Sequence, residues 1–181
     1  MAPARVSVLT PSLDQARFLS ANLDSVRAQG AVVLEHIVID GGSSDGSAAL
    51  LAARGDGKLR WRSAPDRGQS DALNQALRLA RGDVIGWLNA DDVYRPGAAR
   101  RAVALLDSDP GLGAVYGHCD KIDAAGRVIG RVDAHAVSLE SLLGFDTVPQ
   151  PSCFLRRSVL EEAGGVDEAL HYAMDYDLWL R

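Results

Sequence analysis

Short runs of branched aliphatic residues alternate with amphipathic segments along this chain, and that alternation limits its fold more than any other feature. Strand-like runs cover residues 6–10, 37–39, 59–63, 84–88 and 114–116. Between the first two runs, apolar residues recur at positions 16, 19, 23 and 26, which is the spacing of one helix face. Similar helices are predicted from after residue 46 to about residue 54, around 73–80 and around 99–106. Strands that alternate with helices of this length are typical of an α/β fold with a mostly parallel central sheet flanked by helices.

The pattern changes after Gly117. Residues 120–123 and 127–129 flank a short turn and predict a hairpin. Short helices are predicted over 139–143 and 158–163. At the other end of the chain, Pro11 predicts that the first strand stops there. The last residues begin a helix that stops without a cap, so we expect the sequence to end short of the natural chain.

The composition fits an ordinary globular protein, since 47% of the 181 residues are hydrophobic and the formal net charge is -5. No run of about 18 apolar residues predicts a membrane-spanning helix, and the N-terminus lacks the pattern of a secretory signal. Without a block of Lys or Arg, the chain is not expected to bind nucleic acid. Cys119 and Cys153 show neither a metal-binding spacing nor a disulfide pattern, which favours two reduced thiols in a cytoplasmic protein.

The apolar run 84–88 ends abruptly in the sequence Asn89-Ala90-Asp91-Asp92. Two adjacent carboxylates repel each other, and they tolerate this closeness best when a cation lies against them. In open parallel sheets, ligands bind beyond the carboxyl ends of the strands. Each other early strand also ends in polar residues: Thr10-Pro11-Ser12, Asp40-Gly41-Gly42 and Asp66-Arg67-Gly68. Any one of these could be an ordinary turn, but four on one edge favour a site for hydroxyls, phosphates and a divalent cation.

Four segments together resemble the inverting family 2 glycosyltransferases, and they span nearly the whole chain in the order found in that family. The segments are VSVLTPSLDQARFLSANLDSV, HIVIDGGSSDGS, APDRGQSDALNQALRLARGDVIGWLNADD and AMDYDLWLR. The resemblance implies a GT-A type nucleotide-binding fold and a nucleotide-sugar donor. It also implies a single glycosyltransferase domain over 1–181, with residues 1–117 binding the nucleotide-sugar and residues 118–181 facing the acceptor.

The resemblance implies donor-binding roles for nine residues, which are Pro11, Ser12, Asp40, Asp45, Asp66, Arg67, Gly68, Asp71 and Asn89. The first two would lie beside the nucleotide, Asp40 would bind the base, and Asp45 would shape the loop around it. Asp66, Arg67, Gly68 and Asp71 would contact the ribose or the sugar. Asn89 stands at the first position of the Asp-x-Asp motif of the family, and its neutral side chain implies contact with the ribose or a metal-bound water.

The resemblance further implies a Mn²⁺ or Mg²⁺ cofactor held by Asp91, with Asp92 as a helper or outer group. The catalytic base would be Asp175, with Asp177 as the second candidate, because Met174 stands where the family often has Glu. Simpler interpretations stay open: the acidic pair would also suit a turn, and Asp175 would also suit the N-terminus of a helix.

These roles fit a single displacement. The cation stabilises charge on the leaving diphosphate, and the base takes the proton of the acceptor hydroxyl. The family favours a UDP-type donor and implies a carbohydrate or lipid-linked glycan as acceptor, in polysaccharide or glycoconjugate synthesis. A cytoplasmic location follows, with peripheral attachment to a membrane compatible with it.

Two other functions are compatible with the sequence. One is a nucleotide-sugar-binding module without turnover. The other is a metal-dependent phosphohydrolase or nucleotidyltransferase. The acidic-pair phosphatases place a nucleophilic Asp after the first strand, where this chain has Thr10-Pro11-Ser12, and the basic glycine-rich loop of nucleotidyltransferases is also missing.

Overall fold

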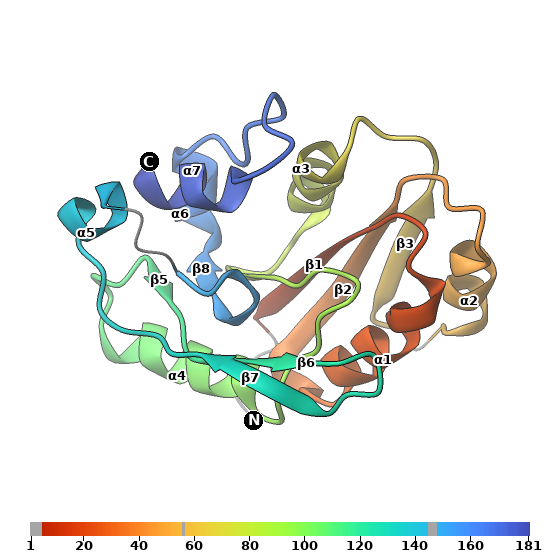
Figure 1. Ribbon diagram of the computed structural model, residues 1–181, viewed down its shortest axis with the longest axis horizontal. Helices are drawn as coiled ribbons and strands as arrows, with labels where there is room; N and C mark the ends of the chain where they lie inside the picture. Colours follow the sequence, from red (N-terminus) through yellow and green to blue (C-terminus); the bar gives the residue numbers. More distant parts are fainter. Residues whose placement is uncertain (1–4, 56, 145–147) are drawn as a thin grey trace.

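The computed structural model describes residues 5–55, 57–144 and 148–181, and a six-stranded sheet forms its centre (Figure 1). The strands are β1 (Val6–Ser12), β2 (Val33–Asp40), β3 (Leu59–Ser63), β4 (Val84–Trp87), β5 (Ala114–Val115) and β8 (Phe154–Arg156). Their spatial order is β3-β2-β1-β4-β8-β5. The first four pair in parallel, and β8 runs antiparallel between β4 and β5. The mostly parallel α/β architecture expected from the sequence is thus confirmed.

Helices cover both faces of the sheet because its central strands carry apolar side chains in both directions. One face packs against α3 (Gln69–Leu79), α6 (Arg157–Glu162) and α7 (Met174–Leu180), and the other against α1 (Ala16–Arg27), α2 (Ser47–Ala53) and α4 (Ala98–Ser108). The remaining elements are α5 (Leu139–Leu143), the 3₁₀ turns η1 (Gly30–Val32) and η2 (Gln150–Ser152), and the hairpin β6 (Cys119–Ile122) and β7 (Val128–Val132). The hairpin and the short helices were predicted within a few residues.

The first strand differs from its prediction, because β1 continues through Pro11 to Ser12. Leu88 N donates to Leu9 O, so the backbone of Leu9 faces β4, as does that of Pro11 two residues later. The pairing of β1 with β4 ends at Leu9. The missing N–H of Pro11 therefore interrupts no ladder.

Two further differences concern strands that the sequence indicated poorly. β2 begins at Val33, four residues before the predicted run, and β8 was not predicted at all. β8 has only three residues, which is too short for a period to be recognised. β8 is nevertheless an inner strand, because it pairs with both β4 and β5. The ring of Phe154 stacks on Tyr94 with centroids 5.1 Å apart.

A buried carboxylate ties together the end of the sheet where its parallel strands begin. Glu35 on β2 is fully buried and accepts hydrogen bonds from Ser7 Oγ at 2.8 Å and from Arg81 N at 2.7 Å. Its other oxygen pairs with Arg60 at 2.5 Å. Burial alone would raise the pKa of Glu35, but these hydrogen bonds outweigh it and lower the pKa below its ordinary value of 4.5.

We expect Glu35→Gln to lower the free energy of unfolding by about 2–4 kcal/mol at pH 7, because the substitution leaves buried donors and Arg60 unpaired. The folded-state pKa is depressed, so this contribution is present above pH 4.5 and is lost as the pH falls through the folded value. Urea unfolding at pH 7 and at about pH 3 measures both effects. Glu161→Gln, which breaks an exposed pair with Arg157, is the control and should change stability by less than about 0.5 kcal/mol. An equal loss in the two variants would contradict the role of Glu35.

Candidate active site

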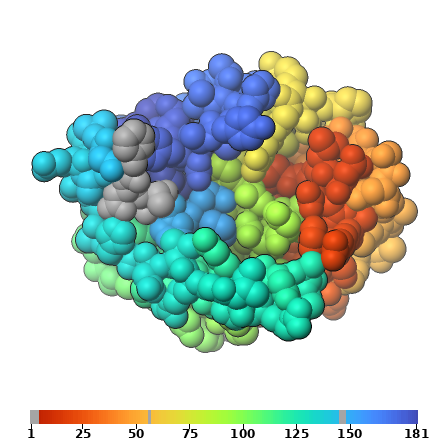
Figure 2. Space-filling model, in the orientation of Figure 1, coloured from red at the N-terminus to blue at the C-terminus, as the bar shows by residue number. Residues whose placement is uncertain are grey.

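The residues predicted to bind the donor and the metal follow the ends of the parallel strands, at one edge of the sheet, whereas Asp175 and Asp177 lie on α7. Ser12 and Asp40 are the last residues of β1 and β2, and Asn89 follows β4 by two positions. In Figure 2, the segment after β4 (yellow-green) lies at the bottom of a depression. The N-terminal residues (red), the β6–β7 hairpin (teal) and the C-terminal part (blue) surround it. Segments far apart in the sequence therefore border one hollow.

Asp40 organises the loop after β2. Its side chain is fully buried and accepts hydrogen bonds from Ser43 N at 3.0 Å, from Ser43 Oγ and from Ser63 Oγ at 2.6 Å. Both carboxylate oxygens are thereby engaged inside the protein. A direct contact of this side chain with a base requires the loop to rearrange.

Asp45 connects the same loop to the start of α1. Its oxygens accept hydrogen bonds from Ser47 Oγ at 2.6 Å and from Ala16 N at 2.7 Å. The bond from the Ser47 side chain is the main reason that the pKa of Asp45 lies below its ordinary value. Asp45 therefore holds the entrance to α1 as an ionised carboxylate at neutral pH.

The loop after β3 folds against the loop after β2. A Cβ atom at Gly41 would lie 3.0 Å from Asp66 Oδ2, so glycine at this position lets the two loops approach closely. Asp66 Oδ1 accepts a hydrogen bond from Gly68 N at 2.9 Å. The loop thus turns directly into α3.

Asp71 in the first turn of α3 is 5% exposed and accepts hydrogen bonds from Arg67 N and from the Arg67 guanidinium at 3.0 and 3.1 Å. The hydrogen bond from the Arg67 side chain is the main cause that lowers the pKa of Asp71. Arg67 itself is largely exposed and also pairs with Glu168 at 2.5 Å. Arg67 is therefore held at the edge of the site between two carboxylates, which compensate its charge.

Asn89 is fixed by three neighbours. Its Oδ1 accepts hydrogen bonds from Trp87 Nε1 and from Gln69 Nε2, both at 2.8 Å. Its Nδ2 lies 3.3 Å from Gln150 Oε1, and Gln150 Nε2 in turn donates to Trp87 O at 2.8 Å. The oxygen of Asn89 has no lone pair left for a metal, whereas one N–H can still donate to a ligand hydroxyl.

Gln69 and Gln150 are parts of the site that sequence reasoning missed. They bond to a residue 20 and 61 positions away, and no local pattern reports such pairs. A polar residue opening a helix at the edge of the sheet was the one available signal for Gln69.

Asp91 and Asp92 form no ion pair within the part of the chain that the structure describes. Asp91 is exposed, while Asp92 is partly buried. Burial, with a smaller contribution from the charge of Asp91, raises the pKa of Asp92 to about 6. Two like charges held here without a counter-charge are costly, so the donor set fits a hard divalent cation with oxygen ligands.

No group of three or more His, Cys, Asp or Glu side chains with metal-binding geometry occurs among residues 5–55, 57–144 and 148–181. A cation at Asp91 would therefore take most of its ligands from water and a bound phosphate, as Mg²⁺ commonly does.

The two acids of α7 differ in their surroundings. Asp177 pairs with Arg181 at 2.9 Å, whereas Asp175 accepts only a hydrogen bond from Tyr176 N at 2.9 Å. Met174, the neighbour of Asp175, is buried in the hydrophobic cluster that also contains Trp87, so α7 packs on this face of the sheet. Of the two carboxylates, that of Asp175 is the less engaged by other side chains among the described residues.

Ser12 adds a buried polar group to the edge of the site. Its side chain is 5% exposed, and its Oγ has no hydrogen-bond partner. A buried hydroxyl without a partner costs free energy, which a ligand contact would offset.

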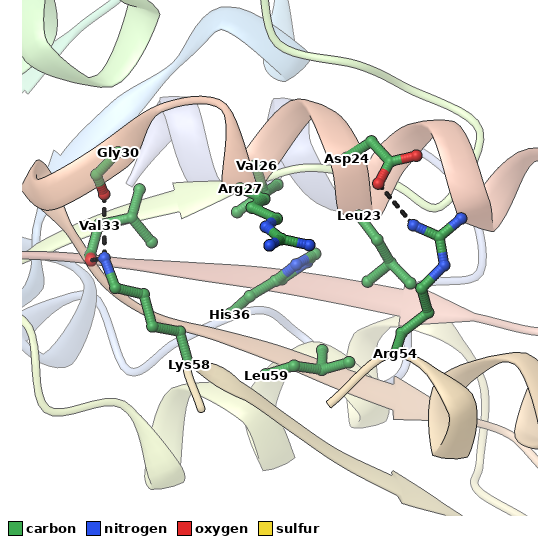
Figure 3. A pocket seen from close by; sticks show the side chains of 10 residues that line it. All are labelled: Leu23, Asp24, Val26, Arg27, Gly30, Val33, His36, Arg54, Lys58 and Leu59. Carbon is green, nitrogen blue, oxygen red and sulfur yellow. Dashed lines mark hydrogen bonds and ion pairs between the residues drawn. The ribbon is translucent and has the colours of Figure 1, made fainter. Parts of the chain in front are cut away.

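A separate cavity of about 170 Å³ lies between α1 and the starts of β2 and β3, at the other end of the sheet (Figure 3). Lys58 Nζ donates to Gly30 O at 3.0 Å and to Val33 O at 2.7 Å. Arg54 pairs with Asp24 at 2.5 Å. These two cations stabilise the fold, and the cavity is distinct from the acidic edge.

Solved glycosyltransferases share this fold. The mannosyltransferase PcManGT from Pyrobaculum calidifontis, in complex with GDP-Man and Mn²⁺, aligns with a TM-score of 0.73 at 22% identity, over 98% of this chain and 51% of that chain. Glucosyl-3-phosphoglycerate synthase from Mycobacterium tuberculosis, in complex with UDP, aligns with a TM-score of 0.70 at 21% identity, over 98% and 65%. The architecture is therefore the GT-A fold of glycosyltransferases. The chain spans about half the length of the first of these proteins.

The sequence itself defines the family. The family model described as glycosyl transferase family 2 matches residues 7–164, so the chain belongs to this family of glycosyltransferases. The uncharacterized glycosyltransferase Rv1514c of Mycobacterium tuberculosis is 35% identical over 182 residues, which is 97% of this chain and 68% of that protein. Membership of glycosyltransferase family 2, expected from the sequence segments, is confirmed, and the family match covers the first three of the four segments.

Among the residues that the structure describes, none of the helices has both the length and the apolar character needed to cross a membrane.

We expect Asp92→Asn to stabilise the metal-free protein at pH 8 by about 1–3 kcal/mol. The folded-state pKa of Asp92 is raised from 3.8 to about 6, so the ionised group destabilises the fold above about pH 6 and the protonated group does not below about pH 4. Urea unfolding in a chelator at pH 8 and at about pH 3.5 should show a difference only at pH 8. Asp91→Asn is the control and should give a smaller gain, since Asp91 is exposed. Equal stability of Asp92→Asn and wild type at pH 8 would contradict the raised pKa of Asp92 and the cost of its ionised form.

Proposed function

We propose that this chain is a metal-dependent, inverting glycosyltransferase that moves a sugar from a nucleotide-diphosphate sugar to an acceptor hydroxyl. The observation that carries the proposal is the acidic pair Asp91–Asp92, which lacks a counter-charge. It lies at the edge of a GT-A sheet, with the available carboxylate of Asp175 on α7. An uncompensated acidic pair suits a cation bridging to a diphosphate, and a second, separate carboxylate suits proton removal.

The donor would lie along the ends of β1, β2 and β4. Pro11 and Ser12 would flank the nucleotide, and the unpartnered hydroxyl of Ser12 supports this contact. Asp40, with Asp45 as the residue that shapes the loop, would form the base-binding side. A base hydrogen bond to Asp40 would replace one of its present bonds to Ser43 or Ser63.

The sugar and ribose side of the donor would be formed by the loop before α3. Asp66, Arg67, Gly68 and Asp71 would contact these groups, with Asp71 acting through the guanidinium that it holds. Asn89 would donate its remaining N–H to a ribose hydroxyl. Arg67 would meet a negatively charged donor with the N–H groups that its pairs with Asp71 and Glu168 leave over.

Asp91, with Asp92 beside it, would hold the divalent cation, and Mn²⁺ or Mg²⁺ both fit carboxylate oxygens. When bound, such a cation stabilises the negative charge that develops on the leaving diphosphate. The presence of Mn²⁺ and GDP-Man in the complex of the related mannosyltransferase supports this donor chemistry.

Asp175 would take the proton of the acceptor hydroxyl while that oxygen attacks the anomeric carbon. Attack from the side opposite the leaving group inverts the configuration, and this route needs no covalent intermediate. The ion pair between Asp177 and Arg181 favours Asp175 for this task, because the carboxylate of Asp177 is already engaged by a side chain of its own helix.

The acceptor side would be built by residues 118–181, within a single domain that covers 1–181. We favour a UDP-type donor and a carbohydrate or lipid-linked glycan acceptor, in polysaccharide or glycoconjugate synthesis. Cys119 and Cys153 are both unbridged, which supports a reducing, cytoplasmic compartment, and peripheral contact with a membrane is compatible with a lipid-linked acceptor.

We expect Asp91→Ala to weaken Mn²⁺-dependent binding of the donor at least about tenfold while the protein stays folded, because the exposed carboxylate makes no contact that the fold needs. Titration calorimetry with a nucleotide diphosphate, with and without Mn²⁺, measures this loss. Asp24→Ala, an exposed acid on α1 that pairs with Arg54, is the control and should bind like the wild type. A metal-dependent titration that is identical in wild type and Asp91→Ala would disprove the metal assignment.

We expect Asp175→Asn to leave donor binding unchanged and to reduce sugar transfer about 10²–10⁴-fold, because the amide cannot accept the acceptor proton. Transfer from a labelled nucleotide-sugar is the measurement, and Asp177→Asn serves as the comparison, with a smaller loss expected. Normal transfer by Asp175→Asn would place the base elsewhere. Donor binding without any turnover in the wild type would favour a binding module, and release of phosphate from simple phosphoesters would favour a phosphohydrolase.

A further inference from the structure

Residues 164–173, between α6 and α7, are attached to α3 by a side chain. Its carboxamide makes the same pair of hydrogen bonds that a neighbouring strand would make. Asn74 Nδ2 donates to Val166 O at 2.8 Å, and Val166 N donates to Asn74 Oδ1 at 3.0 Å. One carboxamide thereby satisfies both backbone groups of a residue 92 positions away. We call residues 164–173 the strap.

Two more side chains strengthen the attachment of the strap. Glu168 accepts a hydrogen bond from Asn74 Nδ2 at 3.0 Å through one oxygen and pairs with Arg67 at 2.5 Å through the other. Ser70 Oγ donates to Leu170 O at 3.1 Å. Ser70 and Asn74 are four residues apart, so they lie on one face of α3.

The strap also carries a glycine where it meets Asn74. Gly165 has a φ of +77°, and a Cβ atom there would lie 2.6 Å from Asn74 Oδ1. A side chain at this position would be strained by the backbone and would push on the carboxamide. The close approach of strap and helix therefore requires both residues.

The strap leads directly into the helix that bears the proposed base. Ala173, its last residue, has a φ of +56°, which is uncommon for a residue other than glycine. Asp177 N donates to Ala173 O at 3.0 Å and begins α7. Asp175 thus lies two residues beyond a segment whose backbone is held by α3.

We propose that Asn74 is a positioning residue that holds the strap, and through it Asp175, at a fixed place relative to the donor. This inference rests on the function proposed above. Arg67 just before α3 and Asp71 in its first turn are the residues proposed to meet the donor, and Asn74 lies about one turn beyond Asp71 on the same helix. In this arrangement, the positions of the donor and of the base are both set by the same helix, α3. Since a displacement of about 1 Å can cost about 10²-fold in rate, the tether controls the chemical step rather than donor affinity.

The test is Asn74→Asp, which keeps the shape of the side chain but cannot donate to Val166 O. Its charge also faces Glu168. We expect kcat for sugar transfer to fall at least about tenfold. The dissociation constant of the donor, measured by calorimetry, should stay within about twofold, and hydrogen exchange should rise in residues 164–173 but not in the loops after β1 and β2.

Arg78→Gln is the matched control, because it changes the net charge by the same amount on α3 and replaces an exposed side chain. It should leave kcat, donor affinity and hydrogen exchange unchanged. Ser70→Ala is a milder variant in case Asn74→Asp does not fold. It removes only the bond to Leu170 O and should lower kcat about two- to fivefold at unchanged donor affinity.

The outcomes separate this inference from the function on which it rests. A wild-type protein that transfers no sugar overturns the proposed function and the positioning role with it. A wild-type protein that transfers sugar, with Asn74→Asp and Ser70→Ala both as fast as wild type, overturns the positioning role alone. A parallel loss of donor affinity and kcat in both variants also overturns it, because it would indicate general damage to α3. The expected rank of kcat is wild type equal to Arg78→Gln, then Ser70→Ala, then Asn74→Asp.

Discussion

Parallel pairing of β1 with both β2 and β4 determines where every polar loop at the site can lie. Parallel strands that share a register must end at the same edge, so their loops leave the core together. The residues inside the strands are buried on both faces and provide no freedom to place these loops elsewhere. The acidic edge is therefore a consequence of the sheet, and the loops only refine it.

The acids of this edge fall into two groups according to the hydrogen bonds that each carboxylate accepts. Asp40, Asp45 and Asp71 accept several internal hydrogen bonds each and serve to hold loops in shape. Asp91 and Asp92 have no such partners among the described residues, and the raised pKa of Asp92 reflects mainly its burial, with a smaller contribution from the charge of Asp91. Residues of one type thus perform opposite tasks, and the number of donors around each carboxylate decides which. The site is rigid where hydrogen bonds are complete and ready for a ligand where they are not.

Much of this arrangement could be read from the sequence, because local patterns report strands, helices and the turns between them. The helix faces, the hairpin and the polar ends of the strands were predicted at nearly their observed positions. Pro11 misled the prediction, because its tolerance in β1 depends on where the neighbouring strand stops pairing. β8 was missed since three residues carry no period. The bonds that fix Asn89 join residues far apart in the chain, and nothing local announces them.

The tethering of the strap illustrates why such contacts matter for function. A helix is stiff along its axis, so two groups mounted on α3 one turn apart keep their separation whatever the loops do. Arg67 lies two residues before α3 and is held by Asp71 in the first turn, while Ser70 in the same turn and Asn74 in the next hold the strap. Glu168 links the two sets of residues, because it accepts hydrogen bonds from both Arg67 and Asn74. The first turn of α3 and the attachment of the strap are therefore joined through one carboxylate as well as through the helix itself.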